Sequence, residues 1–241
     1  MNTFKARGLI LREYEAGESD KRLSLLCKGR GRILVYAKGA KKPKSKFLAA
    51  SQMFTYGDFI LAEGRQFFSL SQAEIITNFY PIRQDYNSLC HAQYLLEICE
   101  KTIPDNTPCD DLLRLLLKTL QHISKKQADI SEKQAVLVFM FRFFLFYGLA
   151  PDMSNCAVCG AELKEGASIF CDEGLVCKRC QVNKPRMKIS PAAAAALVYI
   201  LGSDINTAFM FKVEEQVLKE LEKAARLCWI GHFNINLRTG F

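Results

Sequence analysis

The sequence predicts an α+β multidomain protein in which a small β-barrel at the N-terminus is followed by an α-helical domain. Three observations predict this class. Short runs of alternating apolar and polar residues, separated by glycine-marked turns, cover residues 3–76. From Gln84 onward apolar residues recur every three to four positions, which is the period of an amphipathic helix. Two Cys-x2-Cys pairs interrupt the helical part, and this spacing is typical of a metal-binding element.

The first 80 residues contain five expected strands, at residues 4–14, 23–27, 32–37, 54–62 and 67–76. The last two flank residues 63–66, a four-residue connection with a glycine that suits a β-hairpin. Five strands in so short a segment fit a small closed barrel. The five-stranded oligonucleotide-binding (OB) barrel is the common member of that class, and an SH3-like barrel is the alternative.

Positive charge is concentrated in this barrel. Residues 21–57 contain ten Lys or Arg and no acidic residue, and residues 1–80 account for a net charge of +7 (14 basic, 7 acidic) out of +8 for the whole chain. The densest part, residues 38–46, contains Gly39 and Pro43, which predict an irregular loop. A clustered positive field attracts a polyanion, although a solubilising surface loop is the alternative. The expected contacts with the polyanion are Arg30, Arg32, Lys38, Lys41, Lys42, Lys44 and Lys46.

Aromatic residues accompany these basic side chains, and some of them are candidates for stacking on unpaired bases. Because about half of the positions in a small barrel point inward, we expect at most two or three of these rings at the surface. The candidates are Tyr36, Phe47, Phe54, Tyr56, Phe59, Phe67 and Phe68.

The helical part contains five expected helices. The first is centred on residues 89–99 and stops before Pro104, the second covers 112–123 and the third 132–147. A fourth begins at Ser190-Pro191, an N-cap followed by proline at the first helical position, and a fifth covers 213–230. The apolar run 135–147 spans about 20 Å as a helix, too short for a hydrocarbon core of about 30 Å. We therefore expect a buried central helix and no membrane association.

The cysteine pattern is the most specific signal in the chain. Cys156 and Cys159 form one Cys-x2-Cys pair, and Cys177 and Cys180 form the other, with seventeen residues between the pairs. Four thiolates fill the tetrahedral shell of one Zn²⁺, which predicts a structural zinc with no open position. Cys171 is a fifth candidate, but it lacks a partner at this spacing. We expect the barrel at residues 1–80, helical segments at 81–151 and 186–241, and the zinc element at 152–185.

Motifs of several enzyme classes are absent. The sequence contains no Gly-x4-Gly-Lys-Ser/Thr, His-Glu-x-x-His or Gly-x-Ser-x-Gly motif, so we expect no hydrolysis of a nucleoside triphosphate by the first of these routes and no small-molecule substrate. The acids Glu13, Glu15, Glu18 and Asp20 are conceivable Mg²⁺ ligands of a nuclease, but they crowd one turn and are more simply a solvated turn. The N-terminus shows no secretory signal and the chain has ten cysteines, which favours thiols and metal ligands in the cytoplasm.

The order of parts resembles the bacterial recombination mediator family RecO, over essentially the whole chain. The family's barrel signature is similar to Tyr14-Glu15, Glu18 to Asp20, Leu23 to Leu26, Gly31-Arg32 and above all the segment from Ala37 to Lys46, and its metal-bearing branch has a four-cysteine element among helices. Cys27 departs from the pattern, where threonine is expected, and the tail 236–241 is less basic than the family's.

This resemblance implies a non-catalytic, nucleoid-associated protein of DNA damage repair and recombination. It implies binding of single- and double-stranded DNA and annealing of complementary strands. It also implies association with RecR and the single-strand DNA-binding protein (SSB), and help in loading RecA onto SSB-coated strands, with RecF and RecA as indirect partners. Two other functions fit the residues: an RNA-binding OB and zinc-ribbon module of the translation apparatus, and a metal-dependent nuclease.

Overall fold

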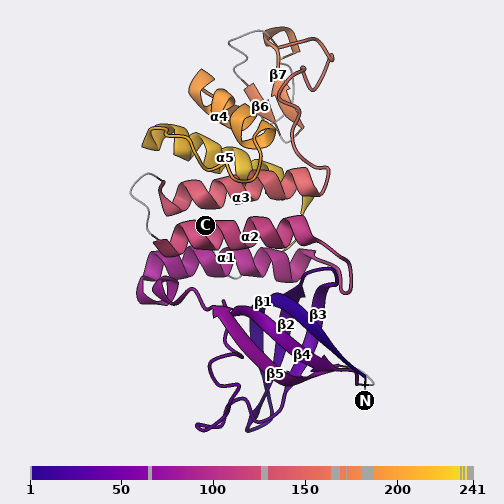
Figure 1. Cartoon of the computed structure of the whole chain (residues 1–241). Coiled ribbons are helices and arrows are strands. Elements are labelled where there is room, and N and C mark those ends of the chain that lie inside the picture. The colour runs from indigo at the N-terminus through magenta and orange to yellow at the C-terminus, as the bar shows by residue number, and fades with distance from the viewer. Residues whose placement is uncertain are drawn as a thin grey trace. The chain divides into compact units, whose positions relative to one another are not determined.

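The computed structural model describes residues 2–64, 67–125, 130–163, 169–171, 173–180, 187–233, 235 and 237 (Figure 1). The chain forms two compact units. One consists of residues 1–125 with the end of the chain from Leu237, and the other of residues 126–236. The division into four segments expected from the sequence remains a prediction.

The first unit contains a closed five-stranded barrel, which confirms the predicted fold class. Its strand order is β1-β2-β3-β5-β4, with β4 pairing back to β1, and every pair is antiparallel except β3 with β5. The strands are β1 (Thr3–Ala16), β2 (Asp20–Cys27), β3 (Gly31–Ala37), β4 (Tyr56–Ala62) and β5 (Phe68–Thr77).

The alternation of the sequence determines which side chains fill the barrel. In β3, Ile33, Val35 and Ala37 belong to the barrel core, so the residues between them point outward. Cys27 also lies in this core, and burial raises the pKa of its thiol to about 12. Its side chain is therefore a small neutral core group at neutral pH.

Two helices follow the barrel in the same unit, after a short 3₁₀ helix η1 (Tyr80–Gln84). The helix α1 (Tyr86–Thr102) begins at Asp85, whose side chain accepts a hydrogen bond from the Ser88 amide, and ends just before Pro104 as predicted. The helix α2 (Asp110–Lys125) also agrees with the prediction.

The loop between α1 and α2 packs tightly on the turn between β2 and β3. Gly31 has φ +68°, and a Cβ added there would lie 1.9 Å from the Thr107 carbonyl oxygen. The Asn106 amide donates to the Arg32 carbonyl at 2.9 Å, and the Gly29 amide donates to Asp110 at 2.6 Å. Only glycine fits this close approach with a left-handed backbone, so Gly31 fixes the loop on the barrel.

The second unit is built on α3 (Glu132–Phe146), which packs with α4 (Pro191–Gly202) and α5 (Glu215–His232). Ten residues of α3 are buried, as expected for a central helix. Arg142 donates to the carbonyls of Ile200 and Ser203 at 2.7 and 2.6 Å, so its charge stabilises the C-terminal end of α4. Among the described residues no helix is long and apolar enough to cross a membrane.

Candidate nucleic-acid interface and metal centre

The basic loop, residues 38–55 between β3 and β4, is anchored to the barrel from within. Ala40 and Phe47 are buried members of the barrel core. The Lys41 amide donates to the Ser19 carbonyl at 2.8 Å, and the Gly39 amide donates to the Asp20 carboxylate at 2.6 Å. The loop is therefore irregular, as predicted, but its position against the β1–β2 turn is fixed.

Most of the lysine ammonium groups of this loop face solvent. Lys38, Lys42, Lys44 and Lys46 are exposed. Lys46 donates to the Ser71 carbonyl at 3.0 Å, and Lys41, half-buried, pairs with the highly exposed Glu15 at 3.2 Å. Within the described part of the chain, Lys38, Lys42 and Lys44 have no carboxylate at ion-pair distance. The basic loop thus presents exposed ammonium groups that form no direct ion pair.

The two arginines of the β2–β3 turn differ from each other. Arg30 is exposed, with its guanidinium carbon 4.0 Å from the centroid of the Phe4 ring. Arg32 is largely buried, pairs with Asp105 at 2.9 Å and donates to the Ile103 carbonyl at 3.1 Å. Because its guanidinium already binds the α1–α2 loop, we omit Arg32 from the proposed DNA surface.

Three of the four acidic residues at the β1–β2 turn, Glu13, Glu15 and Asp20, contact other residues of the barrel. Asp20 accepts from the Tyr36 hydroxyl and from the Gly39 amide, and these bonds hold the pKa of its carboxyl below the usual range. Glu13 pairs with Lys21. These contacts favour the interpretation of the acids as a structural turn over that of a Mg²⁺ site.

Most of the aromatic candidates are too buried to stack on a base. Phe47, Phe54 and Phe59 are buried, and none of the seven is fully exposed. The half-buried rings are those of Tyr36, Tyr56, Phe67 and Phe68. The last of these packs edge to face on Phe4 with the centroids 5.3 Å apart.

Tyr14 and Arg22 point outward from the barrel and were not among the site residues predicted from the sequence. Tyr14 of β1 lies opposite Arg22 of β2, which lies opposite Tyr36 of β3. Strand register places the three in one row, and no local pattern in the sequence gives that register.

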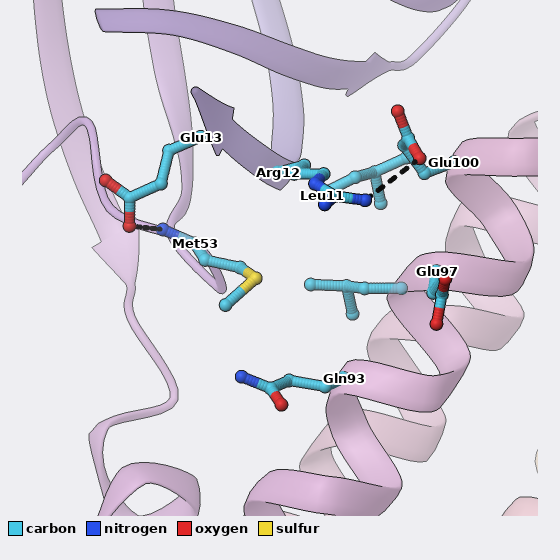
Figure 2. Close-up of a pocket in the computed structure, with 8 residues that line it drawn as sticks. Leu11, Arg12, Glu13, Met53, Gln93, Glu97 and Glu100 are labelled. Atoms are coloured by element: carbon cyan, nitrogen blue, oxygen red, sulfur yellow. Dashed lines mark hydrogen bonds and ion pairs between the residues drawn. The ribbon is translucent and has the colours of Figure 1, made fainter. Parts of the chain in front are cut away.

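A pocket of about 240 Å³ lies between β1 and α1 (Figure 2). Arg12 pairs with Glu100 at 3.7 Å at its edge, and Glu13 accepts from the Met53 amide at 3.4 Å. Glu97 adds a third carboxylate to the lining. With three carboxylates and one guanidinium, this pocket repels a polyanion and is not part of the proposed interface.

The four predicted cysteine ligands come together in the second unit. The Sγ atoms of Cys156, Cys159, Cys177 and Cys180 all lie within 4.8 Å of one another. The hairpin of β6 (Ile169–Cys171) and β7 (Gly174–Val176) leads directly into Cys177, as predicted. Cys171 lies in β6, but its side chain is outside the described part of the structure.

The arrangement of these thiols fits a tetrahedral metal ion. A ZnS₄ tetrahedron with bonds of about 2.3 Å has sulfur–sulfur edges of about 3.8 Å. The Cys159 and Cys177 sulfurs are 3.8 Å apart. The four cysteines can therefore hold a metal ion without a large rearrangement.

The thiols of the cluster differ in how readily they ionise. Cys156 accepts from the Cys177 amide at 3.3 Å, and such bonds lower the pKa of Cys156 to about 6. Hydrogen bonds to the sulfurs of Cys159 and Cys177 raise the pKa of Cys180 to about 12. Four crowded thiols thus resist full ionisation by themselves, and a bound divalent cation removes that resistance.

Comparisons with known proteins cover nearly the whole chain. Residues 1–79 match the family model described as Recombination protein O N terminal, and residues 83–239 match Recombination protein O C terminal. The chain is 36% identical to the DNA repair protein RecO of Acetivibrio thermocellus, over 94% of this chain and 90% of that protein. It is 31% identical to that of Alkaliphilus metalliredigens (95% and 94% covered) and 28% identical to that of Bacillus subtilis (98% and 91% covered). The chain belongs to the RecO family of DNA repair and recombination proteins.

Proposed function

We propose that the barrel binds single- and double-stranded DNA through the basic loop and Arg30. The observation that supports this most directly is the set of exposed lysines, Lys38, Lys42 and Lys44, that pair with no carboxylate of the described residues. Lysines contact phosphates as point charges, so they give affinity without sequence preference. The fixed position of the loop reduces the conformational entropy that binding costs.

Annealing of complementary strands follows from the same charges. Two strands repel each other through their phosphates, and neutralising phosphates on one strand lowers the barrier to approach of the second. No bond in the DNA is made or broken in this proposal, so the protein acts as a mediator and not as an enzyme.

The metal in this proposal is one structural Zn²⁺ held by Cys156, Cys159, Cys177 and Cys180. The apolar cluster around it is small: Cys156 and Val176 are its buried members. A local core of this size stabilises little structure, so a bound ion would contribute much of the stability of the segment.

The proposed partners come from family membership. RecR and SSB are the direct protein partners that we propose, with RecF and RecA acting indirectly and RecA loading onto SSB-coated strands as the outcome. The α-helical surfaces are available for such contacts, since Val198 of α4 and Ile230 of α5 are among the exposed large apolar residues of the second unit.

One experiment separates this proposal from the two alternatives. Complementary oligonucleotides labelled with a donor and an acceptor fluorophore are mixed with the protein in the presence of EDTA, and energy transfer is followed with time. Accelerated annealing supports the proposal. Tighter binding of structured RNA than of DNA would support the translation module, and cleavage that requires added Mg²⁺ would support the nuclease.

A further inference from the structure

Three side chains form a row across the outer face of β1, β2 and β3. Tyr14, Arg22 and Tyr36 are cross-strand neighbours in register. Their inward neighbours Leu23 and Val35 belong to the barrel core, so the row points outward. Arg22 is exposed, and the two tyrosines are half-buried. This row is the part of the outer face that leads toward the basic loop.

Each ring of the row is held in place. The Tyr14 hydroxyl donates to Glu100 of α1, and the Tyr36 hydroxyl donates to Asp20. The guanidinium carbon of Arg22 lies 5.1 Å from the centroid of the Tyr14 ring. A cation at this distance is attracted to the ring, which favours one position of the long arginine side chain. The row is therefore preorganised.

An open pocket of about 590 Å³ adjoins the row at Tyr36. Its walls include Tyr36, Lys38 and Lys42, together with Glu18 and Asp20. Asp20 is occupied by its hydrogen bonds to Tyr36 and to the Gly39 amide, so it orients this wall of the pocket. An aromatic wall beside two ammonium groups matches the two parts of a nucleotide, a flat base and an anionic phosphate.

We propose that Arg22 and Tyr36 form a stacking platform for unpaired bases, and that the adjoining pocket takes one nucleotide of a single strand with its phosphate at Lys38 and Lys42. This inference rests on the proposed DNA binding and adds a preference for single strands to it. The bases of a duplex are paired and stacked on each other, so they do not reach the platform. The platform is short, and bases on either side of it stay free to pair with a second strand.

The test compares an ordinary single strand with an abasic strand of the same length, which keeps the phosphates and lacks the bases. Affinities are measured by fluorescence anisotropy at several salt concentrations, with a duplex as third ligand. For the unmodified protein we expect the ordinary strand to bind about 5- to 150-fold more tightly than the abasic strand. Tyr36→Leu should abolish this difference, and its affinity for the abasic strand and the duplex should match that of Tyr36→Phe within about twofold, because both variants lose the hydrogen bond to Asp20.

Two further variants separate stacking from structure. Tyr36→Phe loses the same hydrogen bond to Asp20 but keeps the ring, so it should retain the preference for the ordinary strand. Arg22→Lys keeps the charge and loses the planar group, so it should reduce that preference with an unchanged salt slope.

Three results would overturn the inference. They are equal binding of both strands by the unmodified protein, full retention of the preference in Tyr36→Leu, and equal loss in Tyr36→Phe. If the unmodified protein bound none of the three ligands, the proposed DNA binding itself would be wrong, which distinguishes the two failures.

Discussion

Replacing Lys38, Lys42 and Lys44 together by alanine removes the three exposed, unpaired ammonium groups of the basic loop. Each lysine that contacts a phosphate adds about 0.7 to the slope of log affinity against log salt for a single strand and about 0.9 for a duplex. The slope should therefore become shallower by about 2.1 for single strands and about 2.7 for duplexes.

The same relation gives the loss of affinity. If the driving force from counterion release vanishes near 1 M salt, each lost contact costs about fivefold in single-strand affinity at 0.1 M. The triple variant should then bind single strands roughly 100-fold and duplexes roughly 500-fold more weakly at 0.1 M salt. The fold should persist, because the buried anchors of the loop, Ala40 and Phe47, are unchanged.

The matched control removes the same net charge elsewhere. Lys188, Lys219 and Lys223 are exposed on β8 (Met187–Lys188) and α5, and none of them forms an ion pair with a described residue. Replacing all three by alanine should leave the slope unchanged if the basic loop is the interface. Fluorescence anisotropy titrations from 50 to 500 mM salt measure both variants. An unchanged slope in the loop variant, or an equal change in the control, would refute the assignment.

Three other outcomes follow from the contacts. Cys177→Ser or a strong chelator should increase hydrogen exchange of the segment 152–180 while DNA binding is retained, and loss of binding by folded, metal-free protein would contradict this. Gly31→Ala should lower the free energy of unfolding by more than about 3 kcal/mol, because the added Cβ clashes with the Thr107 carbonyl. Gly29→Ala has a similar φ but open space around it, so it should lower the free energy of unfolding by about 1 to 2 kcal/mol. Equal losses for the two variants in urea titrations would disprove the clash. Asp58 forms ion pairs with Lys5 and Arg7, which hold the pKa of its carboxyl below the usual range, so its contribution to stability is present above about pH 4 and is lost at lower pH. Asp58→Asn should therefore reduce the loss of stability in acid, as measured by thermal unfolding at a series of pH values. An unchanged pH profile in this variant would exclude these ion pairs as the source of the acid dependence.

Features determined by local sequence were predictable. Strand alternation, the glycine-marked turns, the Ser190-Pro191 helix start and the Cys-x2-Cys spacing each depend on neighbouring residues, and the structure contains a barrel, helices and a cysteine cluster at those places. The observed ends of several helices and strands differ from the predicted ends by a few residues. The strand β1 continues two residues past the predicted end at residue 14, because it pairs with β2 as far as Ala16↔Asp20.

Features that depend on distant residues were not predictable. Arg32 belongs by sequence to the run of cations, yet its partner Asp105 lies beyond α1 and comes close only because the α1–α2 loop packs on the β2–β3 turn. The row of Tyr14, Arg22 and Tyr36 depends on register, and β1 contains an irregularity between Ile10 and Arg12 that shifts its register against β2. A bulge changes which face each later residue occupies, so alternation alone misplaces residues beyond it.

The acidic turn beside the basic loop has a physical explanation that connects these observations. Carboxylates next to a phosphate site oppose binding if they are free, but Asp20 uses both oxygens inside the protein, on the Tyr36 hydroxyl and the Gly39 amide. Those two bonds join the aromatic row to the first turn of the basic loop. Lys38 and Lys42 lie close enough to Asp20 to lower the pKa of its carboxyl, so one carboxylate favours both ammonium groups at the pocket. The acidic turn thus lowers the net positive charge of the site, but it fixes the position of the lysine ammonium groups relative to the tyrosine rings of the row. A rigid arrangement of this kind loses less entropy on binding than a mobile polybasic segment, which explains why a site for a non-specific polyanion contains a half-buried network of hydrogen bonds.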